Sequence, residues 1–489
     1  MTGRHLWFRV GMVLAATLGV VRPLAAQGYR GWLQSTARYV ELRPIQQDTV
    51  AFDLVTRAPD GSLSFEGFPV TCIPDVRCTY YRTVAVQGTV ALTQDLGFTA
   101  WGLGLRGLSV TGLLRARART GGDLIWPRQD DSFDALLAYA QLRRGALRIR
   151  LGRMENTSGL GFSSFDGGSV GAVAGRLRLE AFAGRSLARG LREPISDALR
   201  GIEDFVPDDD AYLYGGSLQV RLPRASSIAL RYQREVFTDP AVLLSERASL
   251  DLRTSGLRPL RINGSVDYDV AFERVGKAHL TLQYLPSDAS FIVELTGRRY
   301  LPYFDLSTIW GFFSPVAYHE AEARGSWAFG GGLGLWAAGG LRRYQDANAT
   351  VVFSPLEDDA WRASAGGNWQ AFTAWRLDGS YRIEWGNGAF LNTADLAVRW
   401  APDERLNLTG SLTAFQQIEE FRVGENVAWG GGASASLEVF PGTRLESGFS
   451  LYLHRPENRA VDRDFNQFRA WSSLRIEIGS DPGLRRRGR

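Results

Sequence analysis

The segment Thr373–Trp385, TAWRLDGSYRIEW, indicates the fold class. Its odd-numbered positions are mostly apolar and include Trp375 and Trp385, whereas its even-numbered positions carry polar side chains such as Arg376 and Glu384. A period of two predicts a strand with one apolar and one polar face. The two tryptophans are ten residues apart, which is roughly 33 Å along a strand. A tilt of ~40° reduces this to about 25 Å, the height of the apolar band between the aromatic girdles of a membrane barrel.

The same alternation recurs in several other segments of the chain. It is found in Leu260–Phe272, in Asp395–Trp400, in 406–414 and in 444–453, where the polar faces carry charges of both signs. Strands of soluble sandwiches usually span only about five or six residues, and charges of both signs suit a wet lumen better than a dry core. We assign Trp400 to the aromatic girdle together with Trp375 and Trp385.

The connections between these segments are of two kinds. Short turns with proline occur at 222–225, 285–288, 401–404 and 440–443, and longer polar or irregular loops at 187–210, 301–315, 345–359, 417–430 and 455–464. Short turns on one rim and long loops on the other are typical of membrane barrels. We therefore predict an all-β fold: a single large transmembrane antiparallel up-and-down β-barrel of about 22 strands (18–22), with short periplasmic turns and long extracellular loops.

One segment cannot be assigned to a single regular strand. In Thr99–Arg119 the apolar positions are odd-numbered at first and even-numbered later. A β-bulge near Arg106-Gly107 would reset the alternation, whereas a turn there would change the strand count.

The two ends of the chain frame this barrel. Residues 1–26 have a positive start with Arg4 and Arg9, an apolar run over Gly11–Val21 and small residues at Ala25-Ala26, which predicts a secretory signal peptide cleaved after Ala26. A membrane anchor is the alternative, although the run is short for a helical span. We assign residues 27–479 to the barrel and 480–489 to a basic tail. The formal charge of +4 lies largely in these two ends, which argues against a nucleic-acid-binding face on the body.

The two cysteines, Cys72 and Cys78, lie in one segment, TCIPDVRCTYY. In an exported protein this spacing favours a local disulfide, and two free thiols are the alternative. We expect no metal there, because no histidine is adjacent and structural zinc takes four ligands.

The chain resembles Gram-negative outer-membrane porin-like proteins along the whole mature part. The resemblance rests on the signal peptide, the aromatic girdles, the asymmetric connections and a last amphipathic strand over Gln467–Ile478. The run Arg150-Leu151-Gly152-Arg153 followed by Phe165-Asp166-Gly167 resembles a segment of alginate-export-like barrels. The resemblance implies a passive or facilitated channel in the outer membrane for small polar solutes, without a cofactor. Its partners would be outer-membrane lipids, lipopolysaccharide and the barrel assembly machinery, with the oligomeric state open.

Two features depart from the patterns of such proteins. The chain does not end on an aromatic residue, which leaves recognition by the assembly machinery in question. A strand pattern that begins around Tyr29 leaves no room for the plug of a TonB-dependent transporter.

Charged residues on the polar faces are the first candidates for function. Arginines in a pore wall favour anions, and the alternative is that they pair with lumen carboxylates and only solvate the wall. The candidates for lumen charge are Arg115, Arg117, Arg119, Arg148, Arg150, Arg176, Arg178, Glu180, Glu320, Glu322, Arg376 and Glu384.

Two long loops are further candidates, because a wide barrel without a plug needs a constriction. We expect loops 187–210 and 300–315 to fill much of the lumen. The second is rich in aromatic residues, and packing against neighbouring loops or the outer leaflet is equally compatible with that composition. A helix is predicted over Glu193–Phe205 within the first loop. The candidate constriction residues are Tyr303, Phe304, Trp310 and Phe312.

We predict that the protein is not an enzyme. The mature chain holds only His279, His319 and His454, each within a strand pattern and without a nucleophile-elbow or zinc-protease motif. The sequence thus favours a channel. A structural or adhesive surface protein with a sealed barrel and a barrel hydrolase remain as alternatives.

Overall fold

The computed structural model describes most of the chain between Gly28 and Gly479. The described residues are 28–42, 45–57, 63–66, 68–73, 77–83, 85–121, 124–125, 132–187, 195–196, 211–238, 243–287, 290–301, 317–345, 359–386, 389–418, 426–456 and 465–479. The predicted signal peptide and basic tail lie outside them.

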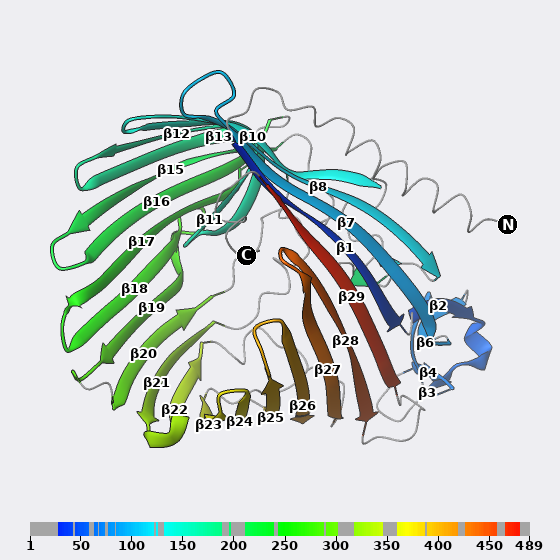
Figure 1. The fold of residues 1–489 in the computed structure, drawn as a ribbon. Coiled ribbons are helices and arrows are strands. Elements are labelled where there is room, and N and C mark those ends of the chain that lie inside the picture. The colour runs from blue at the N-terminus through cyan, green and yellow to red at the C-terminus, as the bar shows by residue number, and fades with distance from the viewer. Residues whose placement is uncertain are drawn as a thin grey trace.

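A closed 22-stranded antiparallel barrel forms the body of the molecule (Figure 1), as the alternation predicts. Each strand pairs with the strands before and after it around the ring, and β1 closes the ring by pairing with β29. The barrel strands are β1 (Gly28–Leu42), β7 (Gln87–Trp101), β8 (Leu108–Gly121), β10 (Phe133–Arg144), β11 (Leu147–Ser158), β12 (Gly161–Ala174), β13 (Leu177–Ser186), β15 (Ala211–Leu222), β16 (Ser226–Phe237), β17 (Leu243–Leu257), β18 (Leu260–Asp269), β19 (Arg274–Tyr284), β20 (Phe291–Tyr300), β21 (Tyr318–Ala328), β22 (Leu333–Tyr344), β23 (Asp359–Phe372), β24 (Trp375–Gly386), β25 (Ala389–Trp400), β26 (Leu406–Ile418), β27 (Asn426–Phe440), β28 (Thr443–Pro456) and β29 (Phe465–Gly479).

The seam of the barrel joins strands from the two ends of the chain. β1 and β29 pair continuously from Arg30 opposite Gly479 to Val40 opposite Arg469. On the lumen side of this seam, the Gln34 amide donates a hydrogen bond to Ser473 Oγ at 3.0 Å, across 439 residues of sequence.

Apolar side chains cover the outer face of the ring. Outward positions such as Leu230, Leu295 and Leu412 are half or more exposed. The polar side chains between them point into the lumen, where many meet across neighbouring strands, as Thr281 and Thr296 do. Among the described residues, no helix is long and apolar enough to cross a membrane.

The two rims differ as the sequence predicts. All four proline-containing turns lie on the rim where β1 begins, and the strand ends that flank the five long loops lie on the opposite rim. In the turn after β25, the backbone N–H groups of Arg405 and Leu406 each donate to Asp403 Oδ1 at 2.8 Å, and they lower the pKa of that carboxyl. The long-loop rim also has short connections, for example between β18 and β19.

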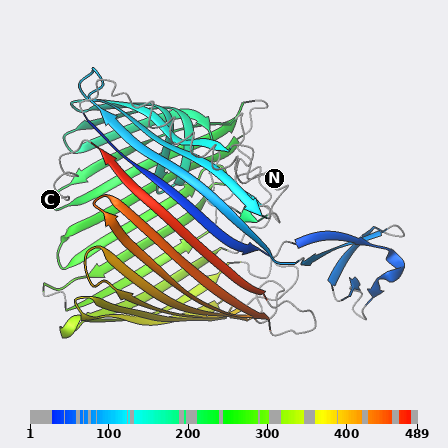
Figure 2. The ribbon, with the colours of Figure 1, turned by 45° about the vertical axis from the view of Figure 1, so that its right-hand side comes forward.

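A second, smaller sheet projects from the long-loop rim between β1 and β7 (Figure 2) and was not predicted. Its strand order is β2-β6-β5-β4-β3, with a short 3-10 turn, η1, at Phe52–Leu54. Val50, Cys78 and Tyr80 form its core. Cys72 and Cys78 lie opposite each other on β5 and β6 and form a disulfide. The strands are β2 (Ile45–Val50), β3 (Thr56–Arg57), β4 (Leu63–Phe65), β5 (Phe68–Ile73) and β6 (Arg77–Thr83).

We expect the disulfide to stabilise this small sheet alone. A closed loop of this length contributes about 2 kcal/mol by chain entropy, and three buried residues form a small core. Replacing both Cys72 and Cys78 with Ser should make residues 45–83 sensitive to limited proteolysis. The heat-modifiable gel mobility of the barrel should stay unchanged, and loss of that mobility would show that the sheet is part of barrel stability.

Three sequence interpretations are corrected or narrowed by these elements. The chain turns between Trp101 and Leu108, so the change of parity there is a turn and not a bulge. β18 ends at Asp269, and Phe272 lies in the following turn instead of the strand. Ile195–Ser196 forms a short strand, β14, paired with β9 (Leu124–Ile125), because extended pairing replaces the predicted first turn of the helix there. The rest of that predicted helix lies outside the described residues.

Candidate functional site: a charged lumen wall and an inward hairpin

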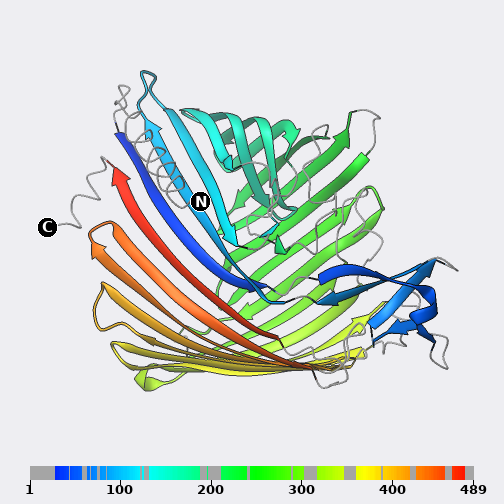
Figure 3. The same ribbon diagram turned by 90° about the vertical axis from the view of Figure 1, so that its right-hand side faces the viewer.

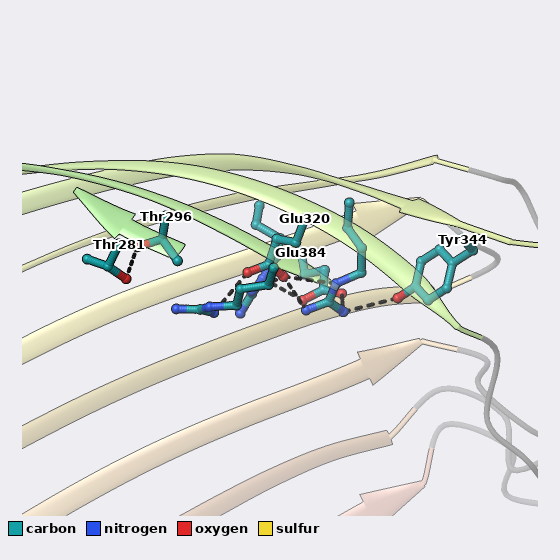
Figure 4. Close-up of polar contacts among 8 residues, drawn as sticks. Thr281, Thr296, Glu320, Tyr344 and Glu384 are labelled. Atoms are coloured by element: carbon teal, nitrogen blue, oxygen red, sulfur yellow. Dashed lines mark hydrogen bonds and ion pairs between the residues drawn. The ribbon is translucent and has the colours of Figure 1, made fainter. Parts of the chain in front are cut away.

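Five lumen-facing charges on five consecutive strands form a continuous ion-pair network, which we call the charge ladder (Figure 4). Arg298 of β20, Arg342 of β22 and Arg362 of β23 all contact Glu320 of β21, at 2.9, 2.8 and 2.7 Å. Arg342 and Arg362 also contact Glu384 of β24 at 2.7 and 3.0 Å. Three guanidinium groups thus face two carboxylates, which leaves a positive balance on this part of the wall.

The ladder is positioned by strand register and by aromatic neighbours. Arg298, Glu320 and Arg342 lie directly opposite one another on adjacent strands. The guanidinium of Arg342 lies 4.2 Å above the ring of Tyr318, and its Nη1 donates to Tyr344 Oη at 3.0 Å. The Glu320 side chain is only 1% exposed. A buried carboxylate held by three arginines fixes the wall electrostatically and cannot move without leaving cations unpaired.

A second group of predicted charges surrounds Glu180 on β13. Arg148 and Arg150 of β11 contact its two oxygens at 2.7 and 2.6 Å, and Arg178 lies 3.9 Å away. The structure therefore brings four of the predicted residues together, with three cations around one anion.

The remaining predicted charges are more scattered. Arg115 forms a bidentate pair with Asp95 at 2.7 and 2.9 Å, and Arg117 lies 3.5 Å from Asp134. Arg376 pairs with Asp378 at 2.9 Å, and both are exposed to the lumen. Arg119 lies near the end of β8, Arg176 lies in the turn between β12 and β13, and Glu322 is half-buried on β21.

Sequence reasoning missed the cations of the ladder. Arg298, Arg342 and Arg362 each follow the lumen-facing parity of their strand, so alternation could have nominated them. Their meeting at Glu320 depends on register between strands, which alternation within one strand does not fix.

The end of the β11–β12 hairpin leaves the barrel wall and lies in the lumen. β11 pairs with β10 only through Leu147–Arg153, and β12 pairs with β13 only through Phe165–Ala174. Residues 155–164 pair with each other instead. Figure 1 shows β11 ending inside the ring of strands, and Figure 3 shows the same curled hairpin from another side.

Three glycines in register mark the place where the hairpin bends. Gly152, Gly167 and Gly184 lie side by side on β11, β12 and β13. Gly152 has a φ of 125°, and a Cβ there would lie 2.2 Å from the carbonyl oxygen of Ala138. The bend therefore requires glycine at Gly152.

An arginine at the same level ties the hairpin base to the wall. Arg153 contacts both oxygens of Asp166 at 2.8 Å, and its Nη1 reaches Asp134 at 3.3 Å and the Ala135 carbonyl at 3.0 Å. The sequence run that resembles alginate-export-like barrels thus forms the hinge of the inward hairpin. Nothing in these contacts assigns the chain to that subfamily.

The tip of the hairpin lies against the lumen face of β17. A Cβ at Gly159 would lie 3.3 Å from Ser249 Oγ and from Asp251 Oδ1, and Leu160 is only 3% exposed. Between the hairpin and the wall lies a mostly polar cavity of about 270 Å³. Its polar lining includes Asn156, Thr157, Arg178, Gln219, Arg231 and Gln233.

Burial in the lumen is uneven around the ring. Among the described residues, all but three of the buried polar side chains belong to the segment from Thr89 to Asp269. On the opposite side of the ring, Arg376 and Asp378 of β24 are 49% and 42% exposed. The hairpin side of the lumen is therefore filled, and the short-turn end of β24 is open to solvent.

The predicted constriction residues Tyr303, Phe304, Trp310 and Phe312 lie outside the described residues, as does nearly all of loop 187–210. The predicted girdle residues are described. Trp375 and Trp385 are 43% and 41% exposed at opposite ends of β24, and Trp375 stacks on Trp400 at 5.8 Å.

The three histidines do not form a common site. His279 faces the lumen, where its Nδ1 lies 2.7 Å from Ser265 Oγ. His319 lies on the outward face of β21, and the side chain of His454 is outside the described residues. No group of three or more potential metal-binding side chains occurs among the described residues.

The chain matches no family model and no curated protein. It is similar in structure to the PapC translocation pore of the P pilus usher, with 10% identity, 92% of this chain and 100% of that chain covered, and a TM-score of 0.40. It is also similar to a BenF-like porin from Pseudomonas fluorescens, with 10% identity, 92% of this chain and 99% of that chain covered, and a TM-score of 0.40. The similarity to OccAB1 of Acinetobacter baumannii has 9% identity, covers 94% of this chain and 100% of that chain, and has a TM-score of 0.40.

Proposed function

We propose that the protein is an outer-membrane channel for the passive or facilitated passage of small hydrophilic solutes. The observation that carries this proposal is the lumen itself: ionised pairs line it, and one side is open to solvent at Arg376 and Asp378. A sealed structural barrel has no need for an exposed charged wall of this kind. The long-loop rim would face outward from the cell, and residues 1–26 would direct export.

The inward hairpin supplies the partial occlusion that a wide barrel requires. It fills the lumen between the hinge at Gly152 and the wall at Ser249. Solutes would pass between the hairpin and the open β24 side, where selection depends on width and on the charges of the wall.

Single-channel recording of the refolded protein in a planar bilayer under a salt gradient tests this function. We expect discrete conductance steps and a reversal potential biased toward anions, because the charge ladder carries more cations than anions. Correctly folded, heat-modifiable protein without steps would contradict the proposal and favour a sealed surface protein.

The exposed pair on β24 offers a matched test of charge selection. Arg376→Gln should shift the reversal potential toward cations, and Asp378→Asn should shift it toward anions by a similar amount. Both side chains lie in one ion pair at the open side of the lumen, so the two variants control for each other. No shift in either variant would show that this part of the wall does not contact the ion path.

A further inference from the structure

Three basic side chains form a row on the outer wall, at the long-loop ends of β20, β21 and β22. Arg299 lies directly opposite His319, and His319 lies directly opposite Arg343. They share the outward face with the exposed Leu295 and Leu341, two to four residues further down their strands. We call these three residues the basic row.

The basic row lies just beyond a band of interfacial aromatic residues. Leu341, Trp361 and Trp385 lie opposite one another on β22, β23 and β24. Trp361 is 53% exposed and Trp385 41% exposed. Tryptophans of this kind lie at the level of lipid headgroups in membrane barrels. Arg343 is two residues beyond Leu341, about 7 Å along the strand, which places the row at headgroup depth.

The charges of the row are poorly compensated by the protein. Among the described residues, the nearby acid is Asp359, whose Oδ1 is 3.9 Å from Arg343 Nε, and both side chains are more than half exposed. The Nε of Arg299 is buried, and no hydrogen-bond partner for it is described. The side chains of Arg343 and His319 are exposed and would pair with an external anion that has several oxygen atoms.

We propose that the basic row binds the phosphate of a phosphorylated lipid of the outer leaflet, of the lipid A type. Guanidinium groups bind phosphate through paired charge-assisted hydrogen bonds, and the imidazole between them can add a third donor. The acyl chains would lie along the apolar wall below, next to Leu341 and Trp361. This site goes beyond the proposed channel and rests on the membrane insertion and orientation of the barrel that were proposed with it.

Native mass spectrometry of the refolded protein with diphosphorylated lipid A, and with the same lipid after dephosphorylation, tests the site. We expect the wild type to retain the phosphorylated lipid. The triple variant Arg299→Gln/His319→Gln/Arg343→Gln should lose at least about tenfold in affinity, since it removes several charge-assisted hydrogen bonds. The matched control replaces Arg144, Arg176 and Arg405 with Gln, because these three exposed arginines lie on the short-turn rim.

The outcomes separate the possibilities. Equal binding of the dephosphorylated lipid, or an equal loss in the control triple, would overturn the proposal. Binding of inorganic phosphate alone with the same affinity would make the row a free-anion site and overturn the lipid assignment. If both triple variants keep the heat-modifiable gel mobility, misfolding is excluded as the cause of a loss of lipid affinity. Absence of conductance would contradict the channel without changing the lipid result.

Discussion

Shortening the β11–β12 hairpin should raise the single-channel conductance severalfold. Replacing residues 155–164 with a two-residue Asn-Gly turn would leave Met154 opposite Phe165, as in the present pairing of β11 with β12. Asn-Gly is a favoured sequence for a two-residue hairpin turn. The change removes the part of the chain that lies across the lumen toward Ser249. The measurement is the step size in a planar bilayer at symmetric salt, together with the largest neutral polyol that still enters the pore.

A crosslink tests the position of the hairpin without deleting it. Gly159→Cys and Ser249→Cys should form a disulfide under mild oxidation, because a Cβ at Gly159 lies 3.3 Å from the Ser249 side chain. The crosslinked protein should keep the wild-type conductance, whereas the shortened variant should not. A crosslink that fails to form, or a shortened variant with unchanged step size, would show that the hairpin does not constrict the pore.

Replacing Glu320 with Gln should destabilise the barrel more than any other single change in the ladder. The carboxylate is 1% exposed and contacts Arg298, Arg342 and Arg362. Its removal leaves three neighbouring cations with one remaining acid, Glu384. Breaking a buried ion pair of this kind costs on the order of 3 kcal/mol. We expect the temperature of the heat-modifiable gel shift to fall by several degrees, and the reversal potential to move further toward anions.

Glu322 provides the matched control for this variant. It lies on the same strand and the same face as Glu320, two residues away, and is half-buried. No ion pair of Glu322 is described, so Glu322→Gln should change the gel shift little. Similar destabilisation by both variants would mean that the ladder contributes no more than any lumen carboxylate.

Much of the fold could be predicted from alternation alone. Trp375 and Trp385 showed both the period of two and the length of a membrane crossing, and the proline turns identified one rim. The small sheet at residues 45–83 was missed, because its strands are short, down to the two residues Thr56–Arg57. Runs of that length carry no periodicity that separates a strand from a loop.

The candidate site was only partly predictable for a different physical reason. Alternation places a residue on a face, so Glu320 and Glu384 could be assigned to the lumen. Contacts between strands depend on register, and register left Arg342 unrecognised as their shared partner. The inward hairpin was not predicted, because the alternation of β11 ends at Gly152 and residues 155–158 carry no apolar side chain. Its signal was the glycine at Gly152, where a left-handed backbone permits the chain to leave the wall.

The seam between β1 and β29 sets the order of events during assembly. Until β29 has been made and has found β1, both strands present unpaired edges, and such edges are prone to pairing with other chains. The contact between Gln34 and Ser473 spans nearly the whole sequence, and contacts of such long range form slowly. Each newly synthesised molecule must therefore be kept apart from its neighbours until its own first and last strands meet, and a chain truncated before β29 would remain open at β1.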